Sequence, residues 1–107
     1  MKFLTRQEEM VLLSVFQLKG NSYLVKIREH LIQITGKEWS ISSVYVPLEK
    51  LRKEGYLDTY IGAPEPKKGG KAIKYYKLTK TAVGALEEVR SILDTMWDNA
   101  DGLAVEG

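Results

Sequence analysis

The sequence predicts a mostly α-helical domain that contains one β-hairpin and ends in a single C-terminal helix. Apolar residues recur at helical spacing in three segments before residue 55 and in one segment after residue 79. Two tyrosine-rich runs, 56–61 and 72–78, alternate like strands and are joined by a loop rich in glycine, proline and lysine. With 107 residues, the chain is expected to form one domain.

The first helix is expected to begin after Thr5, because Thr5 and Glu8 form a T-x-x-E capping box. Gly20 is the expected C-terminal cap, since glycine tolerates the left-handed backbone found there. The residues that recur at helical spacing between these ends are Val11, Leu12, Val15, Phe16 and Leu18.

A second helix is expected from Tyr23 to about Thr35, capped by Ser22 and stopped by Gly36. We interpret His30 as a surface residue, because the chain has no second histidine and no cysteine to share a metal ion. The apolar stripe of this helix is expected to consist of Leu24, Ile27, Leu31 and Ile34.

A third helix is expected to end at Gly55, and either Ser40 or Ser43 can cap it. If Ser43 is the cap, Pro47 lies just beyond the first turn and costs the helix little stability. If Ser40 is the cap, Pro47 removes an interior hydrogen bond and should bend the helix. The expected core face consists of Ile41, Val44, Leu48 and Leu51.

The two strands are joined by residues 62–71, a connection too long for a tight hairpin turn. Tyr75 and Tyr76 are neighbours on the second strand, so their side chains must point to opposite faces. We therefore expect one of them in the core and the other exposed.

The last helix is expected to begin after Thr79 and to end at about Asp98. Its apolar stripe continues past the point where the rest of the chain can cover it, which is typical of contact with another subunit. Residues 99–107 show little periodicity and are expected to form a disordered tail. The stripe consists of Val83, Leu86, Val89, Ile92, Leu93, Met96 and Trp97.

Three helices, a hairpin and a further helix are the element order of a winged helix-turn-helix with a C-terminal dimerisation helix. In this interpretation residues 1–78 form a DNA-binding domain, 79–98 the dimerisation helix and 99–107 the tail. Charge is polarised along the chain, because residues 66–86 hold six lysines and no acid, whereas residues 87–107 hold six acids and one base. Two solvated faces would explain this pattern, but the lysines on the predicted hairpin tip favour a polyanionic partner.

The candidate DNA contacts come from the third helix and from the hairpin. Exposed residues at the start of a recognition helix reach base edges, and lysines of a wing contact phosphates. No arginine, asparagine or glutamine stands at the start of the helix, so we expect modest direct readout of sequence. The alternative is that the serines only cap the helix and that the tyrosine packs on a neighbour. The candidates are Ser42, Ser43, Tyr45 and Val46 on the helix and Lys67, Lys68, Lys71 and Lys74 on the wing.

Other classes of protein are not favoured by the sequence. With one histidine, no cysteine and no glycine-rich phosphate loop after a strand, we expect no enzyme, no metal site and no cofactor. No segment approaches the length of a membrane span and no apolar N-terminal run precedes a cleavage site, so we expect a soluble cytoplasmic protein.

Four passages of the chain form a recognisable pattern: Leu12-Leu13 with residues 18–23, residues 44–48 with Leu51 and residues 54–57, residues 69–76, and Leu78-Thr79. Together they resemble the PadR-type winged-helix transcriptional regulators, in particular the short subgroup with one C-terminal helix. The chain departs from the family pattern where Val46 separates Tyr45 from Pro47, where lysines replace wing arginines, and where Ala82 replaces a glycine.

The resemblance implies a homodimeric repressor whose recognition helices enter successive major grooves of a pseudo-palindromic operator, about 34 Å apart. It also implies an aromatic or apolar effector at Leu93, Met96 and Trp97, for which plain dimer packing is the alternative. A winged-helix dimer that only binds proteins is the alternative function. The residues assigned to the dimer interface are Leu4, Leu86, Val89, Leu93, Met96 and Trp97.

Overall fold

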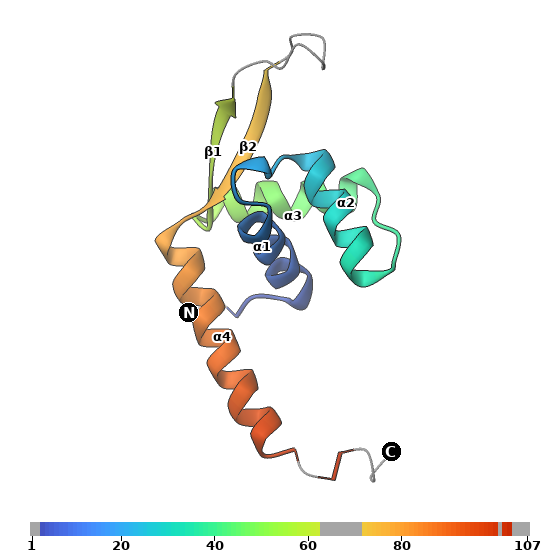
Figure 1. The fold of residues 1–107 in the computed structure, drawn as a ribbon. Helices are drawn as coiled ribbons and strands as arrows, with labels where there is room; N and C mark the ends of the chain where they lie inside the picture. Colours follow the sequence, from blue (N-terminus) through green and yellow to red (C-terminus); the bar gives the residue numbers. More distant parts are fainter. Residues whose placement is uncertain (1–2, 63–71, 101, 104–107) are drawn as a thin grey trace.

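A computed structural model describes residues 3–62, 72–100 and 102–103 of the chain. Helices α1, α2 and α3 form a compact body, the hairpin β1–β2 stands beside it, and α4 leaves the body as a rod (Figure 1). This arrangement is a winged helix, so the predicted fold class is confirmed. The elements are α1 Arg6–Leu18, the 3-10 turn η1 Lys19–Asn21, α2 Leu24–Thr35, α3 Ile41–Lys53, β1 Leu57–Gly62, β2 Ile73–Leu78 and α4 Lys80–Asp98.

The core forms where the apolar stripes of α1, α2 and α3 meet the inner face of the hairpin. Fully burying one such leucine or valine contributes about 1.5–3 kcal/mol relative to leaving it exposed. Together these residues fix the position of α3 relative to the hairpin. The core consists of Leu4, Val11, Leu12, Val15, Ile27, Leu31, Trp39, Val44, Leu48, Leu51, Leu57, Tyr76 and Ala82.

Two residues expected in the core are exposed instead. Ile34 lies in the last turn of α2 and is 67% exposed, and Ile41 is the first residue of α3 and is 47% exposed. Both lie at helix ends, where no neighbouring helix covers them. Trp39 closes the core between these two helices, and its indole Nε1 donates to the Thr35 hydroxyl at 3.1 Å.

Side-chain caps fix the starts of three helices. Thr5 and Glu8 make both hydrogen bonds of the capping box, and the Thr79 hydroxyl accepts from the backbone of Ala82 at the start of α4. Ser40 is the cap of α3, because its hydroxyl accepts from the Ser43 backbone N–H at 3.1 Å. Pro47 therefore lies inside α3 and removes the donor that would reach the carbonyl four residues before it.

Ser22 does not cap α2, contrary to the expectation from sequence. Tyr23 occupies the cap position without a side-chain hydrogen bond, while Ser22 is fully buried. The Ser22 hydroxyl lies 2.7 Å from the carbonyl oxygen of Tyr76 and 3.0 Å from that of Lys19, and it donates toward both. Lys19, with a φ of 53°, also takes the C-cap position of α1 that was expected for Gly20.

The hairpin strands β1 and β2 pair antiparallel, from Leu57 opposite Leu78 to Gly62 opposite Ile73. The expectation that only one of Tyr75 and Tyr76 would be buried is wrong, because both are buried. Tyr76 belongs to the core, whereas Tyr75 stacks on Tyr60 with ring centroids 5.3 Å apart. The edge of Tyr23 completes the cover of Tyr75 at 5.6 Å, so aromatic packing protects the outer face of the sheet.

Most of α4 has no cover within the described part of the chain. Ala82 is its only buried residue, and Ala85, Leu86 and Val89 pack partly against the core. A helix of 19 residues is roughly 28 Å long, so its second half extends beyond the body (Figure 1). The predicted tail lies mostly outside the described residues, which include only 99, 100, 102 and 103 of it.

Replacing Ser22 by alanine should lower the free energy of unfolding by about 1–2 kcal/mol, because a buried hydrogen bond to β2 is lost. Urea unfolding followed by circular dichroism, at one fixed protein concentration, measures the change. The matched control is Ser91→Ala at an exposed position of α4, where we expect a change within about 0.5 kcal/mol. Equal effects of the two substitutions would contradict the structural role of Ser22.

Candidate nucleic-acid interface and apolar groove

The N-terminal half of α3 presents a row of exposed side chains. Ser42 and Ser43 are exposed, Tyr45 is 45% exposed and Val46 is 62% exposed. Ser43 is partly engaged in the helix start, because its hydroxyl donates to the Ser40 carbonyl oxygen at 2.7 Å. The Ser42 hydroxyl also lies 3.3 Å from the Ser40 hydroxyl, although the Ser42 side chain is exposed. Tyr45 and Val46 are therefore the side chains of this row that are most available to a partner, followed by Ser42.

The start of α3 also suits an anionic partner. The first turn holds no acidic residue, so the unpaired backbone N–H groups and the positive end of the helix dipole are not neutralised locally. A phosphate can be accommodated at such a helix start.

Lys74 lies in a different environment from the one expected of a free wing lysine. Its ammonium Nζ is 2.8 Å from Oε2 of Glu49, which lies on α3. The same oxygen accepts from the Tyr76 hydroxyl at 2.7 Å, and the other carboxylate oxygen accepts from Arg52 Nε at 3.0 Å. This cluster of Glu49, Arg52, Lys74 and Tyr76, here called the Glu49 cluster, connects α3 to the second hairpin strand, β2.

Glu49 does not belong to the core face predicted for α3, yet its side chain is only 15% exposed. Burial alone would raise the pKa of Glu49, but the hydrogen bonds from Lys74, Tyr76 and Arg52 outweigh it and lower the pKa to about 2. Burial and the neighbouring Glu49 carboxylate raise the pKa of Tyr76. Glu49 is therefore a carboxylate, and the Tyr76 hydroxyl keeps its proton, throughout the physiological pH range.

Three of the four predicted wing contacts, Lys67, Lys68 and Lys71, lie outside the described residues. Their assignment to phosphate contacts therefore remains a prediction from sequence.

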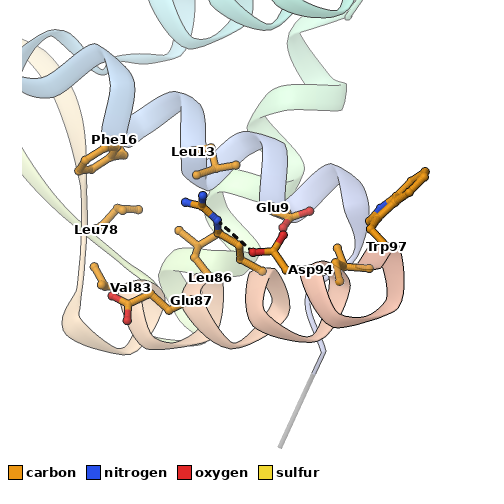
Figure 2. Close-up of a pocket in the computed structure, with 11 residues that line it drawn as sticks. Glu9, Leu13, Phe16, Leu78, Val83, Leu86, Glu87, Asp94 and Trp97 are labelled. Carbon is orange, nitrogen blue, oxygen red and sulfur yellow. Dashed lines mark ion pairs between the residues drawn. The ribbon is translucent and has the colours of Figure 1, made fainter. Parts of the chain in front are cut away.

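An open groove of about 610 Å³ separates α1 from α4, and Figure 2 shows the side chains that line it. Its apolar floor includes Leu13 and Phe16, which is 62% exposed although it shares the helical spacing of the buried residues of α1. Glu9, Glu87 and Asp94 add carboxylates to the lining (Figure 2). The Nε atom of Arg90 lies 3.7 Å from Oδ2 of Asp94. The groove exposes apolar surface from two helices at once, which is typical of an interaction surface.

The residues assigned to the dimer interface divide between several environments. Leu86, Leu93 and Trp97 line the groove, and Val89 lines a smaller hollow of about 310 Å³ beside the N-terminus. Met96 is 62% exposed on α4 and lines neither space. Leu4 is 8% exposed within the chain itself, so it has little surface left for a second copy. Sequence reasoning missed Leu13, which belongs to the same exposed side of α1 as Phe16.

Within the described ranges, no group of three or more histidine, aspartate or glutamate side chains is arranged to hold a metal ion. Over the same residues, no helix combines the length and the apolar character that crossing a membrane requires.

Lowering the pH should remove a stabilising contribution of the Glu49 cluster. Because the pKa of folded Glu49 lies below its ordinary value of 4.5, the contribution is present above about pH 4.5 and is lost as the pH falls toward 2. We expect on the order of 1–2 kcal/mol, reduced by solvent because Lys74 is 38% exposed. Urea unfolding of wild type and Glu49→Gln should show a stability difference at pH 7 that shrinks toward pH 2. A constant difference would contradict the assignment.

Solved structures share this fold, whereas no protein-family model matches the sequence and no curated protein is significantly similar to it. A PadR-like transcriptional regulator from Bacillus cereus is 22% identical, with a TM-score of 0.74 over 91% of this chain and 89% of that one. A PadR family transcriptional regulator from Eggerthella lenta is 23% identical, with a TM-score of 0.70 over 92% and 84% of the two chains. A protein from Streptococcus mutans is 27% identical, with a TM-score of 0.67 over 100% and 95%.

About nine-tenths of this chain is matched in each of the two PadR-type structures. The chain therefore has the winged helix-turn-helix fold of the PadR-type transcriptional regulators.

Proposed function

We propose that this protein is a DNA-binding transcriptional regulator, specifically a homodimeric repressor that acts in the bacterial cytoplasm on a pseudo-palindromic operator. The observation that carries the proposal is the exposed row of Ser42, Tyr45 and Val46 at the start of α3, on a fold shared with PadR-type regulators. An α-helix fits the major groove of B-DNA, and the first residues of a recognition helix contact the base edges.

The chemistry of this row favours weak discrimination between bases. A serine hydroxyl donates to or accepts from any base, valine can contact a thymine methyl group, and tyrosine can reach a phosphate. Because the row offers no bidentate base contact, we propose that the shape of the operator contributes to recognition. Phosphate contacts from Lys67, Lys68 and Lys71 would add affinity without sequence information.

The exposed apolar side of α4 supports the homodimer. Trp97 is 64% exposed and lines the groove, which joins apolar surface of α1 and α4, and Ile92 is 40% exposed and lines the smaller hollow of about 310 Å³. A second copy seated on this surface would remove it from water. An aromatic or apolar effector at Leu93, Met96 and Trp97 is the alternative occupant. Leu93 and Trp97 line the groove, whose volume of about 610 Å³ falls in the range of small-molecule sites, whereas Met96 does not line it.

Replacing Lys67, Lys68 and Lys71 together by alanine should weaken binding to every duplex alike. Each lost phosphate contact reduces the slope of log affinity against log salt by roughly 0.9, so the triple variant should show a clearly shallower slope. Titrations of promoter-derived and arbitrary duplexes at several salt concentrations measure this. Lys80→Ala, in the first turn of α4, is the matched control and should leave the slope within error of wild type.

If the wild-type protein does not bind duplex DNA at low salt, or binds it with an affinity independent of salt, the proposed regulator function is contradicted. A winged-helix dimer that binds only proteins would then be favoured. If the triple variant weakens one sequence and spares the others, the lysines contact bases and the phosphate assignment is wrong.

Replacing Leu93 by glutamate should convert the dimer into a monomer, because it places a charge in the apolar groove. Sedimentation velocity at matched concentrations measures the oligomeric state. Ser91→Glu places the same carboxylate about 200° around α4 from Leu93, outside the groove, and should leave the dimer intact. A Leu93→Glu variant that remains dimeric would place the interface elsewhere.

A further inference from the structure

We propose that Glu49 is a positioning residue that holds the Lys74 ammonium away from DNA phosphates and so lowers the affinity of the protein for every duplex alike. The inference rests on the proposed function, because it concerns the strength of DNA binding. It follows from the geometry of the Glu49 cluster and from the position of that cluster beside the exposed face of α3.

Two contacts hold Lys74. Its ammonium is 2.8 Å from Oε2 of Glu49, and it also lies over the Tyr76 ring, 5.4 Å from the ring centroid. The Tyr76 hydroxyl and Arg52 keep the Glu49 carboxylate in place through hydrogen bonds of 2.7 and 3.0 Å. A charge-assisted contact at this distance is stronger than an exposed ion pair on a mobile side chain, because other hydrogen bonds already hold the acceptor carboxylate in place.

The cluster lies next to the candidate DNA-contacting row. Tyr45 lines the same hollow of about 300 Å³ as Lys74, Ile73 and Tyr76. Tyr45 and Glu49 are one helical turn apart on α3, so both side chains project from the same side of the recognition helix. A DNA backbone that approaches Tyr45 therefore comes near both the lysine and the carboxylate.

The carboxylate has two effects on an approaching phosphate. It neutralises the Lys74 charge, so that Lys74 must leave a charge-assisted hydrogen bond before it can contact a phosphate. It also offsets part of the positive potential that a phosphate would meet at Lys74 and Arg52. Both effects are independent of base sequence, because phosphate contacts carry no sequence information. The protein therefore binds phosphates more weakly than the number of lysines in this region would predict.

Glu49→Gln tests this proposal, because glutamine keeps an acceptor for Tyr76 while it removes the charge that binds Lys74. We expect Glu49→Gln to bind an arbitrary duplex, roughly 20 base pairs long, severalfold more tightly than wild type at moderate salt. The slope of log affinity against log salt should become steeper by roughly 0.9 per protomer, because one additional lysine displaces counterions. A purely structural role of Glu49 would weaken binding and would not steepen the slope.

Adding Lys74→Met to Glu49→Gln should abolish the gain in affinity and in slope. In a double-mutant cycle, Lys74→Met should cost more in the Glu49→Gln background than in the wild-type background. Glu88→Gln, at an exposed position on α4, makes the same change in net charge away from the cluster and should have a smaller effect. Thermal melting of every variant verifies that each one is folded at the titration temperature.

An unchanged or shallower slope for folded Glu49→Gln overturns the proposal, and so does a gain that survives Lys74→Met. If wild type and Glu49→Gln both fail to bind duplex DNA at low salt, the proposed function itself fails. If wild type binds and Glu49→Gln does not bind more tightly, only the role of Glu49 fails.

Discussion

Tyr76 is the residue through which the parts of this fold are held together. Its ring lies in the core, and its backbone N–H donates to the Ser22 carbonyl oxygen at 2.9 Å. Its own carbonyl oxygen accepts from the Ser22 hydroxyl, and its phenolic hydroxyl donates to Glu49. One residue of β2 thus fixes the turn before α2, the helix α3 and the hairpin relative to one another. Because a fully satisfied buried polar network resists rearrangement, the two candidate DNA-contacting elements keep a defined separation.

The body around Tyr76 and the helix α4 differ in how fully the chain covers their apolar side chains. Around Tyr76 the apolar stripes of three helices and the inner face of the hairpin cover one another, and Tyr23 and Tyr60 cover the outer face of the hairpin. Along α4 the opposite holds, since the apolar side that leaves the body meets water over its second half. The apolar surface of the body is therefore covered within the chain, whereas the exposed apolar side of α4 is the surface that a second copy would cover in the proposed homodimer.

In the proposed function, the Glu49 cluster affects how strongly the protein binds DNA. Counting lysines along the sequence treats each one as an available charge, but Lys74 already has a carboxylate partner. That partner comes from α3, 25 residues earlier in the chain. Electrostatic attraction to DNA depends on the charges that remain unpaired in the folded protein, so the sequence alone overestimates what this part of the wing contributes.

The sequence by itself determined the order of the elements and the caps at Thr5 and Thr79, because periodicity and capping depend on residues within one turn of each other. It also indicated the exposed row of α3 and the uncovered stripe of α4. The tertiary structure decided that Ser22 is buried against β2, that Trp39 closes the core and that Glu49 holds Lys74. These contacts join residues from different elements, and the local spacing of a sequence shows which side of a helix is apolar without showing which element will meet it.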